Sequence, residues 1–280
     1  MQEGRHSLAA RHFYRVFELD STRTDALRAL AEALVADGTF AKALPIYEMI
    51  AEIAPSDHTS RFNYAVVLSR LGYYGRAEKL YQSLLGENPA YLKARYNLAV
   101  LYQDQGRLEE AIAGWKLVLA SADKLPSAHR ALGQVYLDIR DLPAAMEQYA
   151  KVAKLCPNDA EAWTELARVA RLAGSLGVAA AAAQRAVGLS PNDADLWADL
   201  GNVKFQMHQH TGDGRFLDEA KAAWEQGLRI DESRKDLRES LDRCSLATTG
   251  DENTSQDFPA STPFGSVSND ASAQSEKVQE

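Results

Sequence analysis

The sequence has few of the residues that build disulfide-linked or metal-held domains. It contains only 2 cysteines, Cys156 and Cys244, among 280 residues, which excludes a disulfide framework or a thiolate metal cluster. Both thiols are best interpreted as small buried side chains. We therefore expect no metal site.

Long apolar runs are also missing. No stretch approaches the roughly 18 apolar residues of a membrane-spanning helix, and the first residues lack the apolar core of a signal peptide. We expect no membrane insertion and a cytoplasmic location.

An excess of positive charge is absent. The net charge is −8, so a nucleic-acid backbone is not an expected partner. Residues 247–280 carry six acids and one base, giving −5, which leaves −3 for residues 1–246.

The motifs of common enzymes are absent as well. We find no nucleophile elbow, phosphate-binding loop or dinucleotide fingerprint. His129 and Arg130 are adjacent on one expected helix, but no serine or cysteine is placed to join them. The sequence predicts a protein that is not an enzyme and needs no cofactor.

What the chain does contain is a pattern that returns every 34 residues. Proline, which ends helices, recurs at this period or twice it at Pro55, Pro89, Pro157 and Pro191. Three further ladders agree with it: alanines at Ala9, Ala43, Ala77, Ala111, Ala145, Ala179 and Ala220; small residues at Ala31, Ala65, Ala99, Gly133, Ala167 and Gly201; and glycines at Gly4, Gly38, Gly72, Gly106 and Gly174. Such agreement at one period indicates a helical repeat array.

The clearest unit runs from Leu92 to Leu125. Its apolar residues recur at helical spacing on both sides of Gly106, which predicts two amphipathic helices joined by a tight turn. In most units an aromatic residue lies four residues after the alanine of the first ladder, as Trp115 does after Ala111. Small side chains opposite large ones allow such helices to pack closely.

These ladders resemble the tetratricopeptide repeat family over roughly residues 1–246. The resemblance implies an all-α fold, a right-handed superhelical solenoid of antiparallel helix pairs, with about six and a half repeats. The expected divisions are the second helix of a truncated repeat (1–23), repeats at 24–57, 58–91, 92–125, 126–159, 160–193 and 194–233, a capping helix (234–246) and a disordered acidic tail (247–280).

Three places depart from the repeat pattern. Pro45 falls inside an expected second helix, which then has to bend. Ala183 stands where other repeats have an aromatic residue. The sixth repeat is expected to contain a turn seven residues longer, between Phe205 and Ala220.

The family resemblance implies that the first helix of each repeat lines a concave groove. In repeats two to four we expect a partner-binding surface with two aromatic rings, two asparagines and several cations. Its members are Phe62, Asn63, Val66, Arg70, Lys93, Tyr96, Asn97, Val100, Gln103, Arg130 and Gln134. Asparagine amides bind peptide backbones, and exposed rings provide pockets for anchoring side chains.

Two more specific resemblances are local. Asn63 and Asn97 are similar to the asparagine ladder of O-linked N-acetylglucosamine transferases, but the next positions hold Ala131, Glu165 and Asp199. Asn63 and Lys93 also match two positions of the carboxylate clamp of chaperone-binding tetratricopeptide domains. Arg28, Glu32 and Asn97 stand where that clamp has Lys, Asn and Arg, so we expect no dedicated clamp.

The remaining candidates have plainer interpretations. Trp115, Trp163, Trp197 and Trp224 fall on repeat positions that pack into the core. His208, His210 and Asp213 lie together in the expected long turn, but they lack a fourth ligand, so a polar loop is favoured over a metal site.

Two functions follow as hypotheses. The first is a non-enzymatic scaffold that holds an extended or helical segment of a partner protein in the groove. The alternative is an accessory repeat region of a larger enzyme or secretion assembly, for example one resembling a glycosyltransferase. Self-association through the uncapped helix at residues 1–23 is a third, weaker hypothesis.

Overall fold

The structure, a computed structural model, describes residues 24–248 and the side chains of residues 24–244. Between Thr24 and Thr248 the chain forms thirteen α-helices and no strand. The expectations for the truncated repeat at 1–23, for self-association through it, and for the tail from residue 249 onward lie outside the described residues.

Twelve of the helices form six consecutive pairs. The first helices of these pairs are α2 (Thr24–Ala36), α4 (His58–Arg70), α6 (Leu92–Asp104), α8 (Pro126–Asp138), α10 (Ala160–Leu172) and α12 (Ala194–Thr211). The second helices are α3 (Phe40–Ile53), α5 (Tyr74–Glu87), α7 (Leu108–Ser121), α9 (Leu142–Leu155), α11 (Leu176–Leu189) and α13 (Gly214–Ile230), and α14 (Lys235–Thr248) follows.

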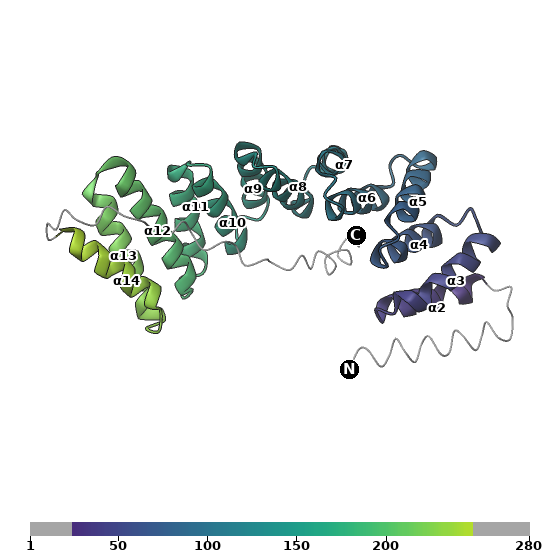
Figure 1. The fold of residues 1–280 in the computed structure, drawn as a ribbon, viewed down its shortest axis with the longest axis horizontal. Helices are drawn as coiled ribbons and strands as arrows, with labels where there is room; N and C mark the ends of the chain where they lie inside the picture. Colours follow the sequence, from purple (N-terminus) through teal and green to yellow (C-terminus); the bar gives the residue numbers. More distant parts are fainter. Residues whose placement is uncertain (1–23, 249–280) are drawn as a thin grey trace.

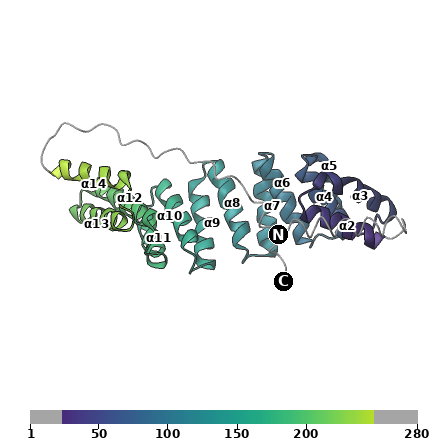
Figure 2. The same cartoon turned by 90° about the horizontal axis from the view of Figure 1, so that it is seen from below.

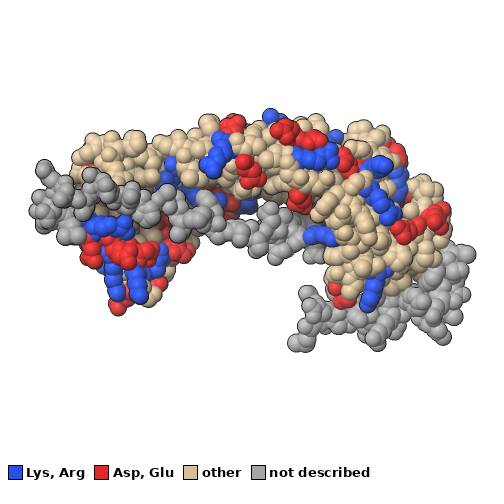
Figure 3. All heavy atoms as spheres, in the orientation of Figure 1, with Lys and Arg blue, Asp and Glu red and all other residues tan. Residues whose placement is uncertain are grey.

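The pairs stack side by side along an arch (Figures 1 and 2). From α2 to α14 each helix packs mainly against its neighbours in sequence. This arrangement confirms the predicted all-α solenoid. Both signs of charge are intermixed over the visible face (Figure 3).

The small-residue ladders sit where the helices approach most closely. The described alanines of the second-helix ladder are fully buried, namely Ala43, Ala77, Ala111, Ala145, Ala179 and Ala220. On the first helices a Cβ added at Gly133 would lie 2.9 Å from the Tyr149 ring, and one at Gly201 only 2.3 Å from Nε1 of Trp224. Small side chains therefore seat the large rings of the second helices.

The turn within each of these pairs requires one residue with a left-handed backbone conformation. Gly38, Gly72, Gly106 and Gly174 have φ between 69° and 80°, a conformation that glycine adopts without steric cost. Arg140 takes the same place in the fourth pair with φ 61°, and it is the one non-glycine residue with positive φ among those described. The turn from α8 to α9 is therefore strained.

The prediction of a long turn in the sixth repeat is wrong. The extra residues lengthen both helices, so that α12 has 18 residues and α13 has 17. Only Gly212 and Asp213 separate them. Gly212 ends α12 in the left-handed conformation, and the Asp213 side chain caps the first turn of α13 by accepting from the Arg215 N–H.

Proline is accommodated differently at two sites. Pro45 lies inside α3, which runs on from Phe40 to Ile53 around it. Pro143 lies in the first turn of α9, where a missing N–H costs nothing. The Asp141 side chain caps that turn, accepting from the Ala144 N–H at 3.1 Å. None of the helices between residues 24 and 248 has a stretch long and apolar enough to cross a bilayer.

Candidate functional site

The predicted groove residues lie on α4, α6 and α8, and none of them belongs to the fully buried core. Arg70 and Lys93 are exposed, whereas the other members are half-buried. Whether this surface binds a partner stays a prediction. The structure does show what each side chain already contacts.

The two aromatic residues are not the exposed rings that were expected. The Phe62 ring centroid lies 6.0 Å from that of Tyr81 and 5.5 Å from that of Tyr91. The Tyr96 ring meets the fully buried Trp115 ring edge-on at 4.8 Å. Both half-buried rings thus pack against aromatic rings of the core, because an aromatic side chain gains more from ring contacts than from water.

Residues at one register position of the first helices contact the residue 29 positions later. Phe62 meets Tyr91 in this way. The Nε–H of Arg130 is shared between both carboxylate oxygens of Glu165, at 2.9 and 2.8 Å, and the guanidinium lies 4.0 Å from Asp159, its partner at this spacing. Burial nevertheless raises the pKa of the Glu165 carboxyl above its usual value, although Arg130 opposes the shift.

The asparagines lie beside buried tyrosine hydroxyls. Burial raises the pKa of Tyr81 to about 12, and hydrogen bonding with Ser69 and Asn97 offsets part of that shift. Burial also raises the pKa of Tyr47, and the Asn63 amide offsets it only in part. The buried Tyr47 hydroxyl nevertheless has no hydrogen-bond partner within the part of the chain that the structure describes.

The glutamines of the predicted site are engaged as well. Gln103 accepts a hydrogen bond from Nε1 of the buried Trp115 at 3.1 Å. Gln134 donates to Asp138 at 2.8 Å within the same helix. Their remaining hydrogen-bonding groups are what a partner segment would meet.

Two cations have different surroundings. The Arg70 guanidinium lies 6.0 Å from the Phe40 ring centroid. Burial raises the pKa of Asp104, and the charge of Arg70 opposes this shift. Lys93 is exposed on α6 beside the half-buried Tyr96 and Asn97. The half-buried Val66 and Val100 pack against the core beneath the same surface.

The structure favours neither the carboxylate clamp nor the asparagine ladder. Arg28, at a clamp position, is bound by the Asp57 carboxylate at 2.6 Å, and the Glu32 carboxylate lies 3.5 Å from the Asn63 amide nitrogen. The asparagine ladder ends at Asn97, because Ala131 holds the next position and Glu165, one repeat further, is paired with Arg130.

The histidines of the sixth pair, His208 and His210, lie in the last turn of α12. The Nδ1 atom of His208 is 2.9 Å from the backbone oxygen of Asp213. The residues that the structure describes contain no cluster of three or more ligands able to hold a metal ion.

The tryptophans divide into two groups. Trp115 and Trp224 are almost fully buried, as predicted. Trp163 and Trp197 are only half-buried, and their indole N–H groups donate to the carbonyl oxygens of Pro157 at 3.0 Å and Pro191 at 2.9 Å. These bonds satisfy carbonyls just beyond a helix end.

Arg95 makes the same contact with the Pro89 carbonyl. His129 lies 2.9 Å from the Asp123 carbonyl oxygen, again six residues back. Sequence reasoning missed this position, although a donor eight residues after the end of α5, α7, α9 and α11 was a signal that could have revealed it.

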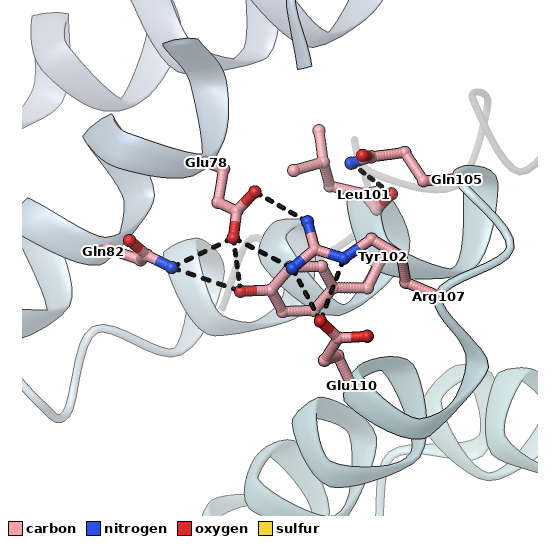
Figure 4. A network of polar contacts seen from close by, with 7 residues as sticks. All are labelled: Glu78, Gln82, Leu101, Tyr102, Gln105, Arg107 and Glu110. Carbon is pink, nitrogen blue, oxygen red and sulfur yellow. Dashed lines mark hydrogen bonds and ion pairs between the residues drawn. The ribbon is translucent and has the colours of Figure 1, made fainter. Parts of the chain in front are cut away.

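A polar network joins the second and third pairs (Figure 4). The Tyr102 hydroxyl donates to Glu78 Oε1 at 3.1 Å, and Gln82 donates to Tyr102 at 3.3 Å. Arg107 contacts Glu78 at 2.7 Å and lies 4.4 Å from the Tyr102 ring centroid. Hydrogen bonds from Arg107 hold the pKa of Glu78 below its usual value although burial opposes them. This network closes the space between α5 and α7.

Sequence models of the tetratricopeptide repeat match residues 1–63, 70–135 and 130–194. The chain belongs to the tetratricopeptide repeat family. Among curated proteins there is no significant match to this chain.

Solved tetratricopeptide structures share the fold. The C-terminal part of a repeat protein from Cytophaga hutchinsonii is 17% identical with a TM-score of 0.72, covering 86% of this chain and 96% of that one. A tetratricopeptide protein from Parabacteroides merdae is 17% identical with a TM-score of 0.56, covering 87% and 94%. YrrB, described as having an unusual peptide-binding site, is 18% identical with a TM-score of 0.54, covering 73% and 98%. At these identities the likeness concerns the fold alone.

Proposed function

We propose that this tetratricopeptide protein is a non-enzymatic scaffold that holds an extended or helical segment of a partner protein against α4, α6 and α8. The solenoid gives the family's general role, protein–protein interaction. A groove site on this chain is the finer step, and a cytoplasmic location belongs to the same proposal. The neighbouring structure of YrrB supports a peptide ligand by analogy only.

The observation that carries the proposal is the set of half-exposed amides beside an exposed cation. Asn63 and Asn97 stand one repeat apart on neighbouring first helices, and Lys93 is exposed one turn before Asn97. Amides offer a donor and an acceptor each, which suits a peptide backbone whose own groups come in the same pairs. A rigid solenoid presents them with little ordering cost.

The packing of Phe62 and Tyr96 limits which variants can test this. Replacing either ring would disturb the contacts with Tyr81 or Trp115, so a loss of binding would be ambiguous. The better variant combines Asn63→Ala, Lys93→Glu and Asn97→Ala. Lys79→Glu, on the exposed surface of α5, makes the same charge change away from the surface and is the matched control.

The experiment has two stages. Affinity capture with mass spectrometry first identifies candidate partners of the full chain. Each candidate is then purified and its affinity is measured for wild type, the triple variant and the control. We expect the triple variant to bind at least tenfold more weakly and the control to bind normally, with unchanged helicity by circular dichroism. Equal affinity of all three proteins would refute the groove site.

A further inference from the structure

An open pocket lies between the second helices of the fifth and sixth pairs. It has a volume of about 610 Å³ and is walled by α11, α12 and α13. Trp197 and Leu200 of α12 contribute apolar surface, and Gln184, Lys204, Glu225 and Arg229 contribute polar groups. The predicted groove residues belong to other helices, so this pocket is a separate surface.

In two earlier places a tyrosine of the first helix fills the space between successive second helices. Between α5 and α7 it is Tyr102, held by the Glu78 carboxylate and covered by the Arg107 guanidinium (Figure 4). The same three groups recur between α3 and α5. There Tyr64 donates to Glu48 at 3.2 Å, with Arg76 5.7 Å from its ring centroid.

The pocket occupies the register of the Tyr102 site. Lys204 stands three repeats after Tyr102, and Gln184 stands three repeats after Gln82. The Lys204 ammonium is drawn to Glu219 of α13 at 2.5 Å. The α11 residue in the register of Glu78 is Ala180, which is buried in the core and does not line the pocket. At the Tyr102 position a flexible amine thus replaces an aromatic ring and fills less of the space.

The space is also lined by a carboxylate and a guanidinium. Glu225 and Arg229 both line it from α13, and within the described part of the chain neither forms an ion pair. Arg229 reaches only the Gln226 side chain, at 3.4 Å. A carboxylate and a guanidinium are the groups that hold the hydroxyl and the ring of Tyr64 and Tyr102.

We propose that this pocket receives the side chain of a tyrosine from a segment of a partner protein. The ring would lie against Trp197 and Leu200, and its hydroxyl would reach the charged groups of α13. Aromatic side chains that fill pockets are common anchors of protein interfaces. The ring of the partner would then occupy a place like those that Tyr64 and Tyr102 fill between earlier second helices.

The test uses the full-length chain labelled with nitrogen-15 and two small probes, N-acetyl-tyrosinamide and N-acetyl-phenylalaninamide. The indole N–H signal of Trp197, assigned with Trp197→Phe, reports binding. We expect a saturable shift with the tyrosine probe. The phenylalanine probe should bind at least fivefold more weakly, because it leaves the polar groups unpaired.

Two variants locate the site. Lys204→Tyr restores the internal ring and should weaken binding of the tyrosine probe at least tenfold. Arg229→Gln keeps the shape and should weaken it about fivefold, a loss of the size expected for one hydrogen bond. Arg215→Gln, on the exposed start of the same helix, should bind normally. Should Lys204→Tyr fail to fold, Arg229→Gln decides.

Three outcomes would overturn the proposal. They are the absence of a saturable shift, undiminished binding by the variants, and equal binding of the two probes. The last outcome would assign the pocket to an apolar group instead of a tyrosine.

Discussion

Replacing Arg140 by glycine should stabilise the protein. Arg140 occupies the turn position where the neighbouring pairs have Gly106 and Gly174, with φ 61°. The turn keeps its hydrogen bonds, since the Arg140 N–H donates to Leu137 at 3.0 Å and the Asp141 N–H donates to Tyr136 at 2.8 Å. The native backbone at this turn therefore already suits a glycine.

The magnitude follows from two opposing terms. A residue with a Cβ pays about 1–2 kcal/mol in the left-handed region. Glycine also gives the unfolded chain more conformational freedom, which lowers the free energy of unfolding by about 0.4–1 kcal/mol. The net gain is about 1 kcal/mol, which corresponds to a rise in Tm of roughly 2–4 °C for a domain of this size.

Circular dichroism during thermal and urea unfolding measures the effect, and hydrogen exchange of the Asp141 amide measures it locally. Two controls test the cause. Arg140→Ala keeps the Cβ and should leave Tm nearly unchanged. Gly106→Arg introduces the same strain one repeat earlier and should lower stability by about 1 kcal/mol. A Tm for Arg140→Gly at or below that of wild type, or equal gains from glycine and alanine, would refute the reasoning.

Three further predictions concern packing, ion pairing and acid sensitivity. Gly201→Ala should lower the free energy of unfolding in urea by about 1–3 kcal/mol, because its Cβ would meet the buried Trp224 indole. An unchanged free energy of unfolding would mean that the Trp224 side chain moves to accommodate the Cβ. Arg130→Ala should destabilise the protein by about 1–2 kcal/mol, because it leaves the Glu165 carboxylate unpaired. Adding Glu165→Gln should recover part of this loss. No recovery in the double variant would exclude the unpaired carboxylate as the cause. Burial alone would raise the pKa of Asp57, but hydrogen bonds from Ser60 and Arg28 lower it overall, so the stability it contributes is present above about pH 4 and is lost as the pH falls through the lowered value. Unfolding midpoints between about pH 5 and pH 2 should therefore fall less steeply for Asp57→Asn, and parallel profiles would count against this role.

Much of the fold was accessible from the sequence. The ladder alanines and the rings four residues later recur at one period, and the contacts that they make are between neighbours in sequence. Local packing of this kind is visible in a repeating pattern, because each pair solves the same packing problem as the one before it.

The sixth pair shows where the pattern was misleading. The insertion between Phe205 and Ala220 looked like a loop because it contains Gly212, Asp213 and two histidines. Glycine and aspartate instead serve as a helix end and a helix cap, and the residues on each side continue the helices. A few capping residues suffice to connect two helices, so the number of inserted residues did not determine the length of the turn.

The candidate site was harder to foresee than the fold. Register predicted which residues of α4, α6 and α8 stand at the surface, but it did not show that Phe62 and Tyr96 rest on core rings or that Arg130 is held by Glu165. Those partners come from other helices, and their distances depend on how successive pairs are stacked.

The sequence alone determined the class of this protein: a run of helix pairs at a period of 34 residues, with small residues opposite large ones. The tertiary structure decided which surface groups are already engaged and which space between α11 and α13 is left open. The physical reason is that a repeat encodes contacts with its immediate neighbour, whereas the free surface is what remains after side chains from adjacent repeats have packed together.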